Sequence, residues 1–395
     1  MTLRTADRNN VGNINSSTKV IAATVMTTIS SVYPTFLAGA LGNTLKQELE
    51  IGDQFFGFMV GSFFAGAMLG SVTLSKVAEK IGGRLTILYG LSATIFVNLF
   101  IAVVARDGYS FIAALTVAGL ANSANQPAVN KLISGEINKS QLGFAVAAKQ
   151  SGMPTAALLG GLAVPGFALT IGWQWAYAAA ALFAIFAWVL IWRVQAESSF
   201  TKKPPGTLRN RKSTLMFAAI GGTTAAAGSG ALTNFLTSSA EDTGLSASKA
   251  GFLLSTAAFI GVLVRLISGI IADKKPNIKP VKVAGILLFI GGFGTIALGL
   301  RDPSVQTGAA IIAVGAGWSW PALFNFGVVK SNISAPSQAT GITQTGVYLG
   351  VLSGPITMGY FVENHSYQTA WTVIAITMFI GSSIFYLASK RIDYE

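Results

Sequence analysis

Long apolar stretches dominate the sequence, and each is about as long as a helix that crosses a lipid bilayer. Such a helix needs about 20 mostly apolar residues. Charged residues make up only 11% of the 395 residues, against roughly 25% in a typical soluble domain, which excludes a water-soluble fold of this size. We expect an all-α membrane protein with twelve transmembrane helices, at residues 20–42, 54–75, 85–105, 109–130, 142–164, 173–193, 214–236, 249–272, 281–300, 304–328, 338–361 and 370–389.

The basic residues gather on alternate loops. If the N-terminus is cytoplasmic and the spans alternate in direction, 21 Lys and Arg residues fall in cytoplasmic segments and four in outer ones. Cytoplasmic loops of membrane proteins carry an excess of Lys and Arg. We therefore expect both termini in the cytoplasm of a multi-pass protein of the bacterial inner membrane. This placement explains the net charge of +12 without a nucleic-acid partner.

The second half of the chain repeats the first at a fixed offset of 194 residues. The pairs that keep this spacing include Glu79 and Asp273, Lys80 and Lys274, Gly57 and Gly251, Pro127 and Pro321, and Gln150 and Gln344. We expect an N-terminal six-helix bundle in residues 1–193, a basic cytoplasmic linker in 194–213 and a C-terminal six-helix bundle in 214–395. Parallel repeats of this kind are related by a pseudo-two-fold axis along the membrane normal.

Three segments of the sequence contain motifs that resemble those of a known family. The loop after the second span reads Ser75-Lys-Val-Ala-Glu79-Lys80-Ile-Gly82-Gly83-Arg84, which is similar to the signature of the major facilitator superfamily, Gly-x-x-x-Asp-Arg-x-Gly-Arg-Arg, with departures at Ser75 and Gly83. A shorter copy, Gly269-Ile-Ile-Ala-Asp273-Lys274, follows the eighth span. Lys149-Gln150-Ser-Gly152-Met-Pro154 in the fifth span is similar to a branch of small bacterial anion transporters that includes cyanate-permease-like proteins.

The resemblance covers essentially the whole chain and implies the major facilitator fold, with a substrate site between two halves that rock against each other. It also implies a cytoplasmic gate formed by loop charges that separate during rocking. Glu79 and Asp273 would be its acids, and Lys80, Arg84 and Lys274 its bases. The alternative is that these residues only cap helices and follow the charge rule for cytoplasmic loops.

Two bases and no acid fall in the interior of the predicted spans, away from their ends. Arg265 lies eight residues before Asp273, which is roughly 12 Å at 1.5 Å per residue, and Lys149 lies at a comparable depth. A charge at this depth costs several kcal/mol unless it is paired or hydrated. We expect a central cavity in which an anionic substrate pairs with both residues, since Arg can bind an oxyanion with two parallel hydrogen bonds. Alternatively, either side chain extends along its alkyl stem to the interface.

The position of Arg265 is similar to that of an arginine in the eighth helix of the oxalate–formate exchanger and of monocarboxylate transporters. The second cation of the exchanger is a lysine of helix 11. In this chain the helix-11 position related to Lys149 by the repeat is Thr343, so the lysine stands in the symmetry-related helix 5. No acid precedes Arg265 in its span, unlike in the monocarboxylate transporters.

Polar and aromatic residues in the spans are further candidates for substrate contact. Asn122 and Gln126 are one turn apart and share a face of one helix. Trp318 and Trp320 lie far from both predicted interfaces, so each either walls the cavity or packs between helices. Tyr33 and Tyr348 could donate a hydroxyl to an oxyanion or form a structural hydrogen bond. With Gln150 and Gln344, these residues and the two cations complete the candidate substrate site.

The sequence favours transport over chemistry. It has no Cys, no metal-ligand cluster and no phosphate-binding P-loop, so we expect neither an enzyme nor a cofactor. We expect a secondary active or facilitative transporter of a small organic or inorganic anion. Exchange is the simplest mode because the spans contain no acid or His to relay a proton. The alternative is a proton-coupled exporter of drugs or other hydrophobic compounds. The expected partners are the anionic substrate and membrane lipid, around a monomer.

Overall fold

The computed structural model describes residues 3–74, 81–137, 141–194, 207–275 and 277–394. Within these ranges, the description does not extend to the side chains of residues 3–17, 72–73, 131, 134–136, 142–143, 273 and 337. The glutamate and lysine of the predicted gate at positions 79 and 80, and most of the predicted linker, therefore lie outside the described residues.

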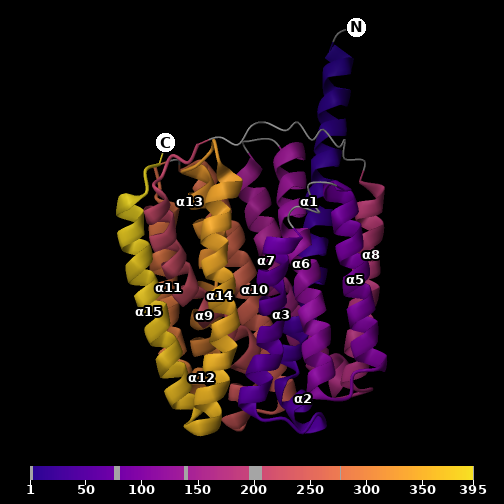
Figure 1. The fold of residues 1–395 in the computed structure, drawn as a ribbon, viewed down its shortest axis with the longest axis vertical. Helices are drawn as coiled ribbons and strands as arrows, with labels where there is room; N and C mark the ends of the chain where they lie inside the picture. Colours follow the sequence, from indigo (N-terminus) through magenta and orange to yellow (C-terminus); the bar gives the residue numbers. More distant parts are fainter. Residues whose placement is uncertain (1–2, 75–80, 138–140, 195–206, 276, 395) are drawn as a thin grey trace.

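Each of the twelve predicted spans corresponds to a helical segment, so the predicted all-helical membrane fold is confirmed (Figure 1). The continuous helices are α1 (Leu3–Ala40), α3 (Asp53–Thr73), α5 (Gly83–Val103), α6 (Gly108–Glu136), α7 (Leu142–Ala163), α8 (Trp173–Arg193), α9 (Lys212–Asp242), α10 (Ala247–Lys274), α11 (Pro280–Leu298), α14 (Pro336–Asn364) and α15 (Tyr367–Arg391). A short helix, α2 (Gly42–Glu48), lies between α1 and α3.

Nine helices of the described chain are long and apolar enough to cross a membrane by length and composition alone. The three other long helices are α6, α7 and α14. They carry the candidate polar residues Asn122, Lys149 and Gln344, which lower their apolar content. Large apolar side chains such as Phe96 and Leu182 lie exposed on the outside of the bundle, as expected for a surface that faces lipid.

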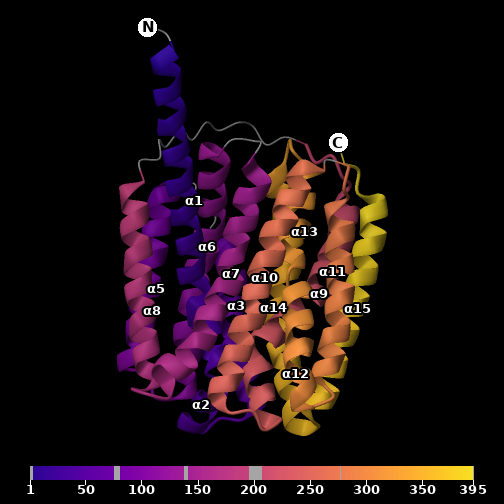
Figure 2. The same ribbon diagram turned by 180° about the vertical axis from the view of Figure 1, so that it is seen from behind.

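Both termini lie at one end of the bundle, here called the terminal end, and α2 lies at the opposite end, the far end (Figure 1). Helices α1 to α8, the N-half, occupy one side of the molecule. Helices α9 to α15, the C-half, occupy the other side (Figure 2). Helices α7 and α10 lie side by side where the halves meet.

The tenth predicted span, expected as one helix over residues 304–328, is interrupted. It consists of α12 (Pro303–Ala310), a π-helical segment η3 (Ile311–Ala316), a break at residues 317–319 and α13 (Trp320–Lys330). Pro321 lies in the first turn of α13, where its missing N–H and fixed φ suit a helix start. Gly317 lies so close to Gly291 of α11 that a Cβ on either residue would clash with the other backbone.

Helix ends follow from local capping chemistry. The Asp107 carboxylate accepts the N–H groups of Ser110 and Tyr109 at 2.9 Å and begins α6 with a capping box. The hydrogen bond from the Ser110 backbone, together with that from Tyr109, holds the pKa of this carboxyl below its ordinary value. Gly82 and Gly172 precede α5 and α8 with φ of 89° and 104°, a conformation that side chains other than glycine rarely adopt.

Three helix pairs join the halves toward the far end, and small residues allow their close approach. In the α3/α14 pair, a Cβ on Gly57 would clash with the Pro355 carbonyl oxygen. In the α7/α10 pair, a Cβ on Gly161 would clash with the Gly251 carbonyl oxygen. In the α1/α9 pair, the Thr237 hydroxyl donates to the Gly39 carbonyl oxygen at 3.0 Å.

The first two of these contacts are related by the sequence repeat. The offset takes residue 57 to 57 + 194 = 251 and residue 161 to 161 + 194 = 355. The contact of Gly57 with Pro355 is therefore equivalent to the contact of Gly251 with Gly161. The repeat detected in the sequence thus corresponds to paired contacts across the interface of the halves.

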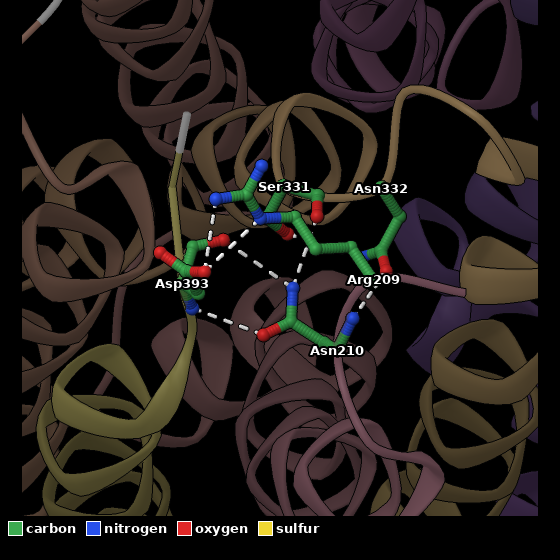
Figure 3. Close-up of polar contacts among 5 residues, drawn as sticks. All are labelled: Arg209, Asn210, Ser331, Asn332 and Asp393. Atoms are coloured by element: carbon green, nitrogen blue, oxygen red, sulfur yellow. Dashed lines mark hydrogen bonds and ion pairs between the residues drawn. The ribbon is translucent and has the colours of Figure 1, made fainter. Parts of the chain in front are cut away.

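A cluster of hydrogen bonds at the terminal end joins the chain before α9 to the C-terminus (Figure 3). The Asn210 side chain donates to the Ser331 carbonyl oxygen at 3.0 Å and accepts the Asp393 N–H at 3.0 Å. The Asn210 N–H donates to the Asn332 side chain at 3.1 Å, and Arg209 pairs with the Asp393 carboxylate at 2.9 Å. The end of the predicted linker is thus attached to the C-half.

Replacing Gly57 by Ala should disturb the interface of the halves. The added Cβ cannot fit against the Pro355 carbonyl, and overpacking costs about 1–3 kcal/mol. Thermal unfolding in detergent should show a lower midpoint than for the wild type. The matched control is Gly308→Ala on α12, where nothing lies within 4 Å of the new Cβ. Equal midpoints for the two variants would contradict the close contact.

Candidate functional site

Arg265 lies in the interior of α10 and connects it to two other helical segments. Its side chain is fully buried, with 0% exposed. The Nη1 group donates to the Gln150 carbonyl oxygen of α7 at 2.5 Å, and the Nη2 group donates to the Trp318 carbonyl oxygen at the break before α13. The first of these bonds crosses from the C-half to the N-half.

Both carbonyl groups are available because their own helices do not use them in the regular way. In an α-helix a carbonyl accepts the N–H of the residue four positions later. For Gln150 that residue is Pro154, which has no N–H and lies inside α7. Trp318 lies in the break between η3 and α13, where the regular hydrogen-bond pattern ends. Arg265 thus supplies donors to carbonyls that the apolar environment cannot satisfy.

An aromatic pair completes this arrangement. The guanidinium carbon of Arg265 lies 4.9 Å from the centre of the Trp318 ring, within range of a cation–π interaction. The Trp318 ring in turn contacts Phe36 of α1, with ring centres 5.5 Å apart. One Arg265 donor atom, Nε, is buried without a hydrogen-bond partner, so its N–H is unused.

Lys149 lies next to Gln150 on α7, and its side chain is only 3% exposed. Among the described residues, the structure shows neither an ion pair nor a hydrogen bond of its ammonium group. The described helices carry acids only near their ends, so no carboxylate lies at a comparable position along them. The site therefore contains a buried positive charge without a counterion among the described groups.

The candidate amides form pairs within each half. Gln126 donates to the Asn122 side-chain oxygen at 3.0 Å on α6, and Gln344 of α14 donates to the Asn325 side-chain oxygen of α13 at 2.6 Å. The Gln150 side-chain oxygen is buried without a partner. The structure thus joins Arg265, Gln150 and Trp318 directly, and shows the other amides as separate pairs.

The aromatic candidates have different surroundings. Trp320 is 1% exposed, and its indole N–H donates to the Ser229 hydroxyl at 3.1 Å. Its ring contacts Phe324 and Phe385 within the C-half, so its contacts are those of interhelical packing, one of the two roles considered from the sequence. Tyr33 is buried and Tyr348 is half-buried.

The described members of the predicted gate lie at the terminal end. Arg84 at the start of α5 donates to the carbonyl oxygen of Trp192, and to that of Ile191 at 3.4 Å. These carbonyls lie at the C-terminal end of α8, where a positive charge interacts favourably with the helix dipole. Lys274 is exposed in the last turn of α10. Arg84 thus has the helix-capping contacts considered as the alternative to a gate.

Polar groups close the far end across both halves. The Asn43 side chain donates to the Glu241 carboxylate at 3.0 Å, and the Gln54 N–H donates to the Glu363 carboxylate at 2.7 Å. The first pair borders a pocket of about 350 Å³ lined by Asn43, Lys46, Asp53, Ser238, Glu241, Asp242, Leu245 and Tyr367. These bonds must break if the halves separate at this end.

Sequence reasoning identified Arg265 but missed its partners. We expected the guanidinium to pair with an anionic substrate or to extend to the interface, whereas two backbone carbonyls bind it. One signal was present, because Pro154 follows Gln150 by four residues and leaves the Gln150 carbonyl without its usual donor. The second carbonyl had no such signal, since the break at Trp318 depends on the packing of Gly317 against Gly291.

Substituting each buried cation by Met should have opposite effects on stability. Arg265→Met leaves two carbonyls without a donor, at about 1–3 kcal/mol each, and should lower the unfolding midpoint in detergent. Lys149→Met removes a buried charge that has no described partner, so the midpoint should stay unchanged or rise. A lower midpoint for Lys149→Met, similar to that of Arg265→Met, would show that Lys149 is bonded in the folded protein.

Comparison with known proteins identifies the fold and the family of the chain. Among solved structures, the chain is similar to a bacterial homolog of the human lysosomal transporter Spinster, in an inward-facing and unoccupied conformation. The TM-score is 0.75 with 13% identity, over 95% of this chain and 98% of that one, so this likeness concerns the fold. No curated protein matches the sequence. Residues 17–332 match the family model of the Major Facilitator Superfamily, and the chain therefore belongs to this family of multi-pass membrane transporters.

Proposed function

We propose that this protein is a secondary active or facilitative transporter of a small organic or inorganic anion, with Lys149 and Arg265 as the central anion-binding cations. The observation that carries the proposal is that Lys149 is a buried residue, 3% exposed, whose ammonium group has no counterion among the described groups. A buried charge is costly unless it is paired. An anionic substrate is the counterion that would make the site favourable.

Arg265 supports the same proposal by its unused donor. A carboxylate or inorganic oxyanion binds a guanidinium best through two parallel N–H groups. Nε offers one of them, and a terminal nitrogen now bonded to a backbone carbonyl offers the second. The Arg265 guanidinium contacts the backbone of Gln150, the residue after Lys149, so one anion between the two side chains could contact both cations.

Neighbouring polar groups would complete the coordination of the anion. Asn122 with Gln126 on α6 and Gln344 on α14 offer amide N–H groups, and Tyr33 and Tyr348 offer hydroxyl groups. The buried side-chain oxygen of Gln150 lacks a donor, which suits a substrate that carries a hydroxyl or amino group beside its negative charge. The proposed site does not include Trp320, whose contacts lie within the C-half.

The proposal places the terminal end in the cytoplasm of the bacterial inner membrane, following the distribution of basic residues. The two six-helix bundles, residues 1–193 and 214–395, would rock about the central site as a monomer, joined by the linker 194–213. The structure, with the far end closed by Asn43 and Glu241, would then correspond to a state closed to the outside. Loop charges that include Asp273 and Lys274 would form the cytoplasmic gate.

Counterflow in proteoliposomes tests the function. The purified protein should exchange at least one member of a panel of labelled carboxylates, sulfonates and inorganic oxyanions. Lys149→Gln should reduce the initial rate at least about ten-fold, the factor that 1.4 kcal/mol of lost interaction produces. Arg265→Gln should have a similar effect. Lys249→Gln, the same substitution at an exposed position of α10, should keep the wild-type rate.

Two outcomes would contradict the proposal. If the wild type exchanges anions and both central variants do so at the same rate, the two-cation site is wrong. If the wild type moves only lipophilic cations or other hydrophobic compounds, and does so with a proton gradient, the protein is an exporter instead.

A further inference from the structure

The contacts between α7 and α10 form a regular series across the interface of the halves. The two helices are antiparallel, so contacting residue numbers should have a nearly constant sum. Gly161 meets Gly251, and Leu158 accepts from the Ser255 hydroxyl at 2.9 Å. A Cβ atom added to Gly261 would lie 3.8 Å from the Cβ atom of Pro154, in ordinary van der Waals contact. The bond of Gln150 with Arg265 continues this series at 2.5 Å.

Arg265 stands at the end of this series nearest the terminal end. The hydrogen bonds and close glycine contacts that the structure shows between the described parts of α7 and α10 run from Gly161 at the far end to Gln150. The contacts nearer the far end involve small or apolar groups that can separate without leaving a charge exposed. The bond from Arg265 is the one member of this series with a charged donor, and charge-assisted hydrogen bonds are roughly twice as strong as neutral ones.

The acceptor of this bond lacks its regular donor in its own helix. Pro154 removes the N–H that would otherwise bind the Gln150 carbonyl, and the Arg265 Nη1 group donates to this carbonyl instead. Separation of α7 from α10 leaves this carbonyl without its Arg265 donor, and leaves the Nη1 group of Arg265 without this acceptor, in an apolar interior. The halves are therefore held together at this point as long as nothing replaces the carbonyl.

An anion is a stronger acceptor for a guanidinium than a neutral carbonyl is. We infer that Arg265 and Gln150 form an interhelical lock that an anionic substrate opens by taking the place of the Gln150 carbonyl, so that the empty protein changes conformation slowly and exchange is faster than net flux. This inference rests on the proposed function and describes the regulation of the same site.

The lock can be weakened without changing either cation. Pro154→Ala returns an N–H to α7 that can bind the Gln150 carbonyl, so the carbonyl no longer requires Arg265. The matched control is Pro127→Ala, which also removes a proline from inside a helix but at an exposed position of α6. Pro154→Leu is a second variant that restores the same N–H, should the alanine variant fold poorly.

Distances between spin labels measure the conformation without any need for a known substrate. The chain has no native Cys, so a pair of cysteines at Val104 and Leu300, both exposed at the far end, can be labelled selectively. In nanodiscs without anion, the wild type and Pro127→Ala should each show a single, short distance between the two labels. Pro154→Ala and Pro154→Leu should each gain a second, longer distance. A transported anion added to the wild type should produce the same longer distance.

Transport measurements complete the test. The ratio of exchange to net efflux should be high for the wild type and Pro127→Ala, and should fall at least about three-fold in Pro154→Ala. If both Pro154 variants keep the wild-type distance and the wild-type ratio while anion exchange continues, the lock is wrong and the proposed function stands. If no labelled anion is transported, or anions do not alter the wild-type distance, the substrate-opened lock is overturned; failure of transport also overturns the proposed function.

Discussion

The structure depends on the way that buried polar backbone groups are satisfied in an apolar medium. A membrane helix normally satisfies its own carbonyls, and each exception needs a donor from elsewhere. In the described part of this protein, two such exceptions lie at one place: the Gln150 carbonyl, one turn before Pro154, and the Trp318 carbonyl at the break before α13. Arg265 binds both, and so joins α7, α10 and α13 at the interface of the halves. A charge that would be unfavourable alone becomes a structural link.

Among the described residues this link has no counterpart related by the internal repeat, because the central residues depart from the repeat. The offset relates Gln150 to Gln344 and Arg265 to residue 265 − 194 = 71, which is Ser71. The Ser71 hydroxyl donates to the Met68 carbonyl oxygen of its own helix at 2.7 Å, so no equivalent bond crosses on the other side of the axis. The glycine contacts toward the far end keep the repeat, whereas the central residues depart from it. Symmetric packing around an asymmetric centre fits the proposed function, in which one anion binds at a central site.

The long elements of the fold could be predicted from the sequence, because membrane length and hydropathy constrain each span independently. The π-helical segment η3 and the break at Gly317 could not, since they depend on the close approach of α11. The depth and burial of Lys149 and Arg265 were likewise expected from their spacing along the helices, and both are buried. The backbone partners of Arg265 were missed because the search for counterions considered only side chains. The partners of Arg84 were missed for the same reason, because its N–H groups donate to the last backbone carbonyls of α8.

The central claim is that an anion pairs with Lys149 between the halves. An experimental structure of the protein with a bound anion, determined with one that it exchanges, tests this claim most directly. The account predicts density for the anion within hydrogen-bond distance of Lys149 Nζ and of the Arg265 guanidinium, with the Gln150 carbonyl no longer bonded to Nη1. Density for the anion at another place, with Lys149 directed toward lipid and Arg265 still bound to both carbonyls, would contradict it.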